Sequence, residues 1–219
     1  MKFTLDWLSQ YTDISELSAD TLAESLTMLG LEVDSVTPLY SELAALKTAT
    51  VLSTEPHPNA DKLTLCQVKV GDQQLQIVCG APNVREGLHT VIALPGTTLP
   101  GDFKIKKSKV RGIESFGMLC SERELGLSDS HQGIIELSSE IEDGQSFIEA
   151  AGLADTQVEV DLTPNRPDCA SVIGIAREVA GVTRKELKLP VEDAVVEAVS
   201  GSFTVEVESP ELCPRYGAM

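Results

Sequence analysis

The sequence predicts a mixed fold, in which segments of α+β character flank an all-β barrel. Two observations lead to this prediction. Apolar residues recur at helical spacing near residues 3–29 and again at 170–180, and between these segments the spacing changes to two, as in half-buried strands. Turn-forming residues interrupt the middle region repeatedly, and many short strands with frequent turns are typical of a small closed barrel.

The first 38 residues are expected to form a small unit of two helices and a strand. Four apolar side chains predict a short amphipathic helix at the start: Phe3, Trp7, Leu8 and Tyr11. A second helix is predicted after Ser18, whose hydroxyl is a good N-cap, and Gly30 is placed to end it in a left-handed conformation. Residues 31–34 then alternate between apolar and acidic side chains, which predicts a short strand.

Residues 39–149 carry the pattern of the barrel. The candidate strands are 47–54, 63–70, 73–79, 89–94, 103–111 and 116–121. Proline, glycine, asparagine and aspartate cluster between them, as in segments 57–61 and 81–83, and these residue types favour turns. Phe103 and Phe116 are the only Phe, Trp or Tyr residues of the candidate strands, and both are expected in the core.

Helical periodicity returns after the barrel. A helix is predicted at 170–180, with Asp168 as its N-cap, and the two prolines of segment 163–168 are expected to make a rigid entry to that helix. Residues 188–201 mix proline with acidic and small residues and are predicted to be a linker. Residues 202–208 alternate again, and a strand that begins where a chain stops suggests a truncated domain.

Composition narrows the function classes. The 219 residues carry a formal net charge of −17 and are 42% hydrophobic, which argues against a disordered chain. Five cysteines, odd in number and far apart, argue against a disulfide scaffold and for a reducing cytoplasm. Neither a signal peptide nor an apolar run long enough to span a membrane is found, so no membrane partner is expected. The acidity argues against wholesale polyanion binding, and DNA is not an expected partner.

One basic segment stands out against this acidity. Residues 41–111 are the only net-positive stretch, with nine basic against six acidic side chains. The stretch ends in five cations within eight residues: Lys104, Lys106, Lys107, Lys109 and Arg111. Composition alone favours a strand edge that lysines keep soluble over a phosphate-binding surface.

Motifs of common catalytic sites are missing. Neither phosphate-binding loop, GxxxxGK[ST] or GxGxxG, occurs, and no GxSxG elbow is found. The cysteines and histidines lack metal-ligand spacing. We therefore expect no catalytic residue and no metal site in this chain.

A long ordered series of motifs identifies a known module. Its first half is His57-Pro58-Asn59-Ala60-Asp61-Lys62-Leu63 and Ile77-Val78-Cys79-Gly80-Ala81-Pro82-Asn83-Val84. Its second half is Leu99-Pro100-Gly101, Arg111-Gly112, Ser115, Gly117-Met118, Cys120-Ser121 and Glu124-Leu125-Gly126. The series resembles the tRNA-binding OB-fold module of bacterial phenylalanyl-tRNA synthetase β subunits, which is also appended to methionyl- and tyrosyl-tRNA synthetases.

The flanks resemble the phenylalanyl β subunit in particular. The matching segments are Trp7-Leu8, 26–33, 131–137, 163–178 and Cys213-Pro214-Arg215-Tyr216. The resemblance therefore covers nearly the whole chain. Because the family's β subunit is several times longer, the chain resembles its N-terminal portion.

The resemblance implies an architecture and a function. An OB-fold barrel at 39–149 is inserted in a small α+β domain made of 1–38 and 150–190, and 191–219 are a linker and the start of a truncated following domain. The implied function is a non-catalytic part of phenylalanine–tRNA ligase, an enzyme that charges tRNA with phenylalanine using ATP and magnesium. The implied partners are tRNA and the α subunit of an α2β2 assembly. Catalysis and editing lie elsewhere in the family, so no cofactor is expected in these residues.

With this resemblance, the basic segment becomes a candidate tRNA interface. The candidate contacts are Lys62, Lys104, Lys106, Lys107, Lys109, Arg111, Ser115 and Ser121. Solubility remains the alternative role for the lysines, and hydrogen bonding within turns and strand ends remains the alternative for the serines. Two other functions stay open as well: a free-standing tRNA-binding or chaperone-like protein, and a protein-interaction scaffold that binds no RNA.

Overall fold

The computed structural model describes residues 1–130, 132–189 and 206–214. Met1–Lys188 forms one compact unit, and Leu189–Met219 forms a second. His131, most of the linker predicted at 188–201, most of the strand predicted at 202–208, and Arg215 and Tyr216 lie outside the described residues. In the part of the chain that is described, no helix has the length and hydropathy needed to cross a membrane.

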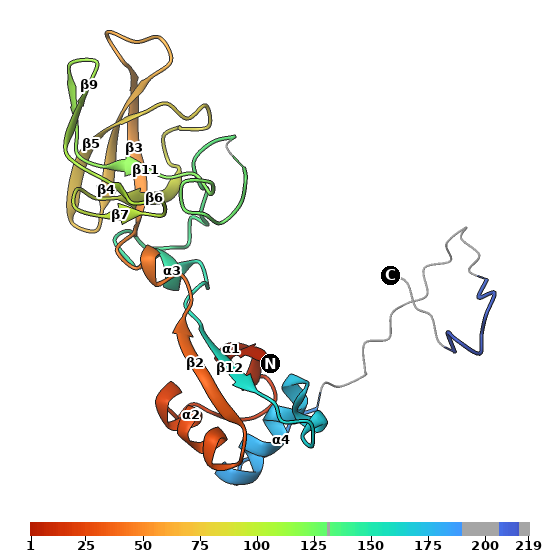
Figure 1. Cartoon of the computed structure of the whole chain (residues 1–219). Helices are drawn as coiled ribbons and strands as arrows, with labels where there is room; N and C mark the ends of the chain where they lie inside the picture. The colour runs from red at the N-terminus through yellow and green to blue at the C-terminus, as the bar shows by residue number, and fades with distance from the viewer. Residues whose placement is uncertain (131, 190–205, 215–219) are drawn as a thin grey trace. The chain divides into compact units, whose positions relative to one another are not determined.

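A three-stranded antiparallel sheet brings together segments from both ends of the first unit (Figure 1). Its order is β1 (Lys2–Thr4), β12 (Thr156–Asp161), β2 (Glu32–Pro38), so a late strand lies between two early ones. Three helices complete this part: α1 (Leu5–Ser9), α2 (Ala19–Met28) and α4 (Val172–Thr183). Sheet and helices share one hydrophobic core, which includes Phe3, Leu8, Leu22, Leu26, Leu31, Val158, Val160, Ile175 and Val179.

The N-terminal signals predicted α2 correctly and α1 only in part. Ser18 Oγ accepts the N–H of Thr21 at 3.1 Å, and Gly30 follows the helix with a φ of +81°. The first helix is shorter than predicted because Phe3 lies on β1, and Thr4 is the N-cap. Strand β12 was not predicted.

The prediction that Asp168 caps the helix at 170–180 is wrong. Ser171 is the N-cap of α4, and its Oγ accepts the N–H of Gly174 at 3.1 Å. Asp168 lies in the preceding 3-10 turn, η2 (Pro167–Cys169), where its carboxylate accepts hydrogen bonds from Arg166 at 3.1 and 3.2 Å. Asp168 lies three residues before the N-cap position, so its carboxylate belongs to the turn and not to the helix.

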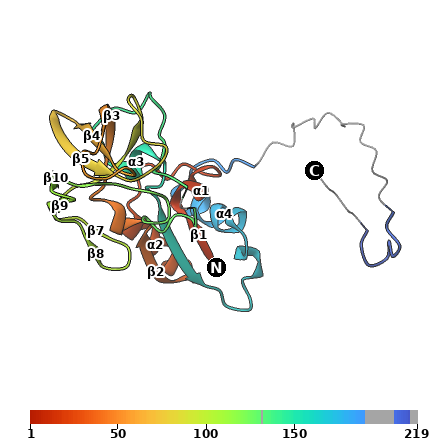
Figure 2. The ribbon, with the colours of Figure 1, turned by 90° about the horizontal axis from the view of Figure 1, so that it is seen from above.

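The middle of the chain forms a five-stranded antiparallel sheet that curls into a half-barrel (Figure 2). The strands are β3 (Lys47–Pro56), β4 (Thr64–Val70), β5 (Gln73–Cys79), β6 (His89–Ala93) and β11 (Met118–Leu119), in the order β11-β6-β3-β4-β5. The two edges approach each other just before β11, where the N–H of Phe116 donates to Gln76 O of β5 at 2.9 Å. A curled OB-like sheet within an α+β arrangement confirms the predicted fold class.

The barrel region has hydrophobic clusters of its own. One cluster includes Val51, Val68, Ile77, Ile92 and Leu119. The other includes Leu43, Val91, Leu99, Ile105 and Phe147, and the short elements η1 (Ser41–Leu43) and α3 (Phe147–Ala150) contribute to it. The barrel side chains are thus buried against one another rather than against the small sheet.

Two small hairpins replace the single strand predicted at 103–111. β7 (Thr98–Leu99) pairs with β8 (Phe103–Lys104), and β9 (Ser108–Val110) pairs with β10 (Ile113–Ser115). The strand predicted at 116–121 is reduced to β11. Phe103 is 56% exposed, so its predicted place in the core is wrong, and Phe116 is half-buried.

Candidate nucleic-acid interface

The six candidate cations are all exposed on segments of the barrel region. Lys62 lies in the loop before β4, and Lys104 lies on β8. Lys106 and Lys107 connect β8 to β9, Lys109 lies on β9, and Arg111 follows that strand. The two hairpins and the segment that joins them therefore carry five of the six cations.

A two-residue loop places Arg111 at the tip of the β9–β10 hairpin. Val110 pairs with Ile113, and the two residues between them, Arg111 and Gly112, have φ values of +50° and +94°. Positive φ at both central residues is the arrangement of a type I′ hairpin turn, in which glycine or asparagine is usual. A left-handed conformation costs a residue such as arginine about 1 kcal/mol. The turn therefore places the Arg111 guanidinium at the tip of the hairpin in spite of this conformational cost.

His57 connects this tip to the turn that carries Lys62. The side chain is 5% exposed. Its Nδ1 accepts the N–H of Asn59 at 3.1 Å, so the proton lies on Nε2, which donates to Val110 O at 3.1 Å. Asn59 Nδ2 also donates to Arg111 O at 3.3 Å. The sequence predicted only a turn at 57–62, because the histidine's partner is more than fifty residues away.

Lys107 differs from the other cations because the protein already engages its ammonium group. Nζ lies 3.2 Å from Glu114 Oε2 on β10 and 4.4 Å from the centroid of the Phe116 ring. None of the other five cations has an ion-pair or hydrogen-bond partner for its charged group among the described residues: Lys62, Lys104, Lys106, Lys109 and Arg111. These five charges are free to meet phosphate.

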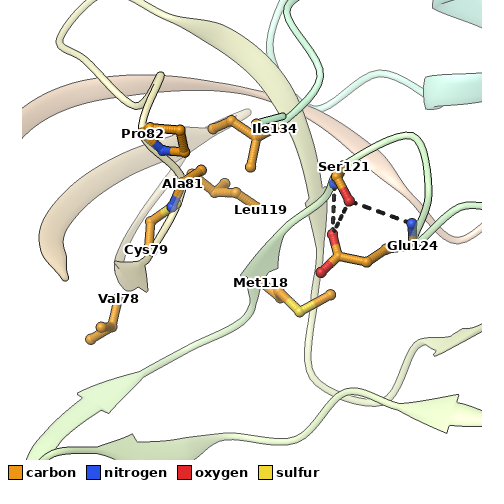
Figure 3. Close-up of a pocket in the computed structure, with 11 residues that line it drawn as sticks. Val78, Cys79, Ala81, Pro82, Met118, Leu119, Ser121, Glu124 and Ile134 are labelled. Atoms are coloured by element: carbon orange, nitrogen blue, oxygen red, sulfur yellow. Dashed lines mark hydrogen bonds between the residues drawn. The ribbon is translucent and has the colours of Figure 1, made fainter. Parts of the chain in front are cut away.

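The two candidate serines are buried, and their hydroxyls bond within the protein. Ser115 Oγ accepts the N–H of Val78 at 3.1 Å and donates to Gly117 O at 3.0 Å, which attaches β10 to β5. Ser121 Oγ donates to Glu124 Oε2 at 2.8 Å, and the same carboxylate oxygen accepts the N–H of Ser121 at 2.7 Å (Figure 3). Ser-x-x-Glu bonding of this kind is a capping box. The structure brings neither hydroxyl to the surface with the cations.

The Ser121–Glu124 pair lines a cavity of about 380 Å³ that has no catalytic constellation (Figure 3). Its walls are mainly apolar, with Val78, Ala81, Pro82, Met118, Leu119 and Ile134. Cys79 also lines it, and burial raises the pKa of that thiol, which keeps it protonated at neutral pH. No histidine lies in the wall to activate the thiol. The cavity therefore offers no activated nucleophile.

A second polar cluster, at the entry to α4, holds the fold together. Arg166 contacts Asp168 at 3.1 Å and Glu178 at 2.9 Å, and it donates to Leu29 O at the end of α2 at 3.4 Å. The hydrogen bonds from Arg166 lower the pKa of Asp168 to about 2, whereas burial raises the pKa of the neighbouring Cys169 thiol to about 11. Asp168, Cys169 and Glu178 are close enough to be considered as metal ligands. They do not fit a metal, because a guanidinium already pairs both carboxylates and the thiol stays protonated.

Comparisons with known proteins agree with the series of motifs. Residues 46–146 match the family model described as a putative tRNA binding domain. Over its full length, the chain is 65% identical to the phenylalanine–tRNA ligase beta subunit of Desulfotalea psychrophila and 50% identical to that of Syntrophotalea carbinolica. It is also 45% identical over 99% of its length to the corresponding subunit of Pseudomonas putida. The chain spans about a quarter (27%) of the length of each of these relatives.

Proposed function

Because the chain belongs to the family of phenylalanine–tRNA ligase beta subunits, we propose that it is the non-catalytic N-terminal part of such a subunit. In this role it contributes tRNA binding and assembly to the ATP-dependent charging of tRNA with phenylalanine. One observation carries the proposal: the similarity extends through both flanks of the barrel and covers the whole chain. A free-standing tRNA-binding protein would share the barrel alone.

The proposed binding is electrostatic. Five exposed cations have no partner in the part of the chain that the structure describes: Lys62, Lys104, Lys106, Lys109 and Arg111. Each neutralises one phosphate of the RNA backbone when bound, with release of counterions. Phosphate contacts position an RNA without reading its sequence. The rest of the chain is acidic and repels the same phosphates, so the affinity of this chain alone is low.

The whole enzyme would have partners and cofactors beyond these residues. We propose the synthetase α subunit of an α2β2 assembly as the protein partner, the cytoplasm as the location, and ATP with magnesium as the requirement of the charging reaction. The group formed by Asp168, Cys169 and Glu178 does not suit magnesium, because Arg166 already pairs with both carboxylates.

The proposed domain division assigns residues 1–38 and 150–190 to one domain and 39–149 to the barrel, with 191–219 leading into a further domain. The separate hydrophobic clusters support it, since the core around Phe3 and Ile175 draws on residues 3–31 and 158–179, and the barrel clusters draw on 43–147. Excision of 39–149 should then leave a remainder that circular dichroism finds folded. An unfolded remainder would contradict the division.

A salt titration tests the proposed function. The purified 219-residue chain should bind a tRNA transcript with a dissociation constant in the micromolar range or weaker, about 10⁻⁶–10⁻⁴ M, and the binding should weaken steeply as salt is raised. The same preparation should catalyse no phenylalanine-dependent pyrophosphate exchange. Absence of salt-dependent binding would instead assign the barrel a scaffold role, and measurable exchange would contradict a non-catalytic role.

A further inference from the structure

Phe103 is an aromatic side chain that the protein exposes in the middle of its basic segment. It is 56% exposed. Its chain neighbours Gly101, Asp102 and Lys104 are exposed too, so the ring stands in polar surroundings and not in an apolar patch. The hydrophobic effect favours burial of a phenylalanine side chain, so this exposure needs an explanation.

The exposure follows from how the β7–β8 hairpin is anchored. Leu99 on β7 is 3% exposed and Ile105 after β8 is 4% exposed, and both belong to the same barrel cluster. Backbone hydrogen bonds continue the ladder below β8, with Ile105 N donating to Thr97 O at 2.8 Å and Gly96 N donating to Ile105 O at 2.9 Å. The stem is thus fixed in the barrel, while Phe103 pairs with Leu99 at the end of the ladder, next to the Pro100–Asp102 loop.

Unpaired cations lie within three positions of Phe103 along the chain. Lys104 follows Phe103 directly on β8, and Lys106 follows Ile105, and neither ammonium group has a partner among the described residues. Phe116, which lies between β10 and β11, already has the Lys107 ammonium over its ring. An exposed ring on a fixed backbone, next to unpaired cations, is how proteins bind single-stranded nucleic acid: bases stack on the ring and cations follow the phosphates.

We propose that Phe103 stacks on an unpaired base of the bound RNA, while Lys104 and Lys106 contact the adjoining phosphates. The inference rests on the proposed tRNA binding and deepens it, because it gives the interface a preference for unstacked nucleotides over duplex. The bases of a duplex are stacked on one another, whereas those of loops and ends are available to an aromatic side chain. The charge of the surroundings argues against an apolar protein segment as the occupant.

The test compares three RNA probes and two substitutions in the 219-residue chain. The probes are a tRNA transcript, a single strand of about 12 nucleotides, which lies within the site size of an OB fold, and a blunt duplex of the same length. Phe103→Leu keeps the apolar bulk and removes the aromatic ring. Trp7→Leu on α1 is the matched control, because Trp7 is 47% exposed and lies on a helix outside the barrel region.

Phe103→Leu should weaken binding of the single strand and the tRNA about five- to a hundredfold and leave duplex binding unchanged. The salt slope should stay that of the wild type, because no phosphate contact is lost. Trp7→Leu should bind all three probes like the wild type. If the wild type binds in a salt-dependent manner and Phe103→Leu binds the single strand equally well, stacking is excluded while the proposed function stands. If the wild type binds none of the probes, the proposed function fails as well.

Discussion

Cationic side chains have different surroundings in the small α+β part and in the barrel. At the entry to α4, Arg166 is 21% exposed and pairs with two carboxylates, those of Asp168 and Glu178. On the barrel hairpins the cations are exposed, and among the described residues the charged groups of Lys104, Lys106, Lys109 and Arg111 have no partner.

This difference separates charge that stabilises the fold from charge that is available to a ligand. Arg166 joins η2, α4 and the end of α2, so its contacts lie within the protein. Among the described residues, Lys104, Lys106, Lys109 and Arg111 have no carboxylate partner for their charged groups. We therefore expect substitutions around Arg166 to alter the stability of the fold, and substitutions of the unpaired barrel cations to alter RNA binding.

The largest effect is expected from Gly174→Ala, at the point where α4 packs against η2. A methyl group on Gly174 would lie 1.9 Å from the backbone oxygen of Asp168 and 3.0 Å from Cα of Cys169, so the turn or the helix must move. Such overpacking should lower the free energy of unfolding by about 3 kcal/mol, measured by urea denaturation.

Gly181→Ala in the same helix is the matched control. Gly181 is exposed, and nothing lies within 4 Å of its added methyl group. Since alanine favours a helix interior by about 1 kcal/mol over glycine, this variant should be as stable as the wild type or slightly more stable. Equal stability of the two variants would mean that η2 does not pack closely on α4.

The next effect in size is expected on the barrel. Replacing Lys104, Lys106 and Lys109 together by glutamine should reduce the slope of log K against log salt for tRNA binding by about two to three units, near one for each lost phosphate contact. The free energy of unfolding should hardly change, because exposed, unpaired lysines contribute little to stability. A folded triple variant with the wild-type slope would return these lysines to a role in solubility alone.

Sequence patterns predicted the elements with local causes and missed those with distant ones. The Ser18 cap and Gly30 specify α2 within a few residues, and alternation specified β3 to β6. Strand β12 escaped prediction because its partners, β1 and β2, lie more than a hundred residues earlier, although Val158 and Val160 alternate with polar residues.

The sequence predicted which cations belong to the candidate site, but not which of them are already paired within the protein. Exposure of the lysines follows from their type, whereas the pairing of Lys107 depends on Glu114, which lies on β10 beyond the Arg111–Gly112 turn and outside the predicted strands. Phe103 was assigned to the core because hydrophobicity was its only local signal. Its exposure depends on the end of the barrel core at Leu99 and Ile105, which is a property of the fold.

A smaller effect is expected from Asp168→Asn at low pH. Hydrogen bonds from Arg166 lower the pKa of Asp168 from 3.8 to about 2, so the folded state favours the ionised carboxylate. The resulting stability is present above about pH 4 and is lost as the pH falls toward 2. The melting temperature of the wild type should therefore approach that of Asp168→Asn between pH 4 and 2. Asp129→Asn, at an exposed loop position, is the control. If the melting temperatures of the wild type and Asp168→Asn differed by a constant amount over this pH range, the role of the ion pair would be contradicted.

The smallest effect on binding is expected from Lys107→Gln, which tests the comparison within the basic segment itself. Lys107 must give up its contacts with Glu114 and Phe116 before it can meet a phosphate, so its loss should change the salt slope by less than the unit expected for Lys109→Gln. Lys107→Gln should instead lower the free energy of unfolding by about 0.5 kcal/mol, the usual size of an exposed ion pair, and Lys109→Gln should not. Salt titrations and urea denaturation of both variants measure the two effects. Equal salt slopes for Lys107→Gln and Lys109→Gln would mean that bound RNA displaces Glu114 from Lys107. In that case, ion pairing within the protein would not decide which cations contact the RNA.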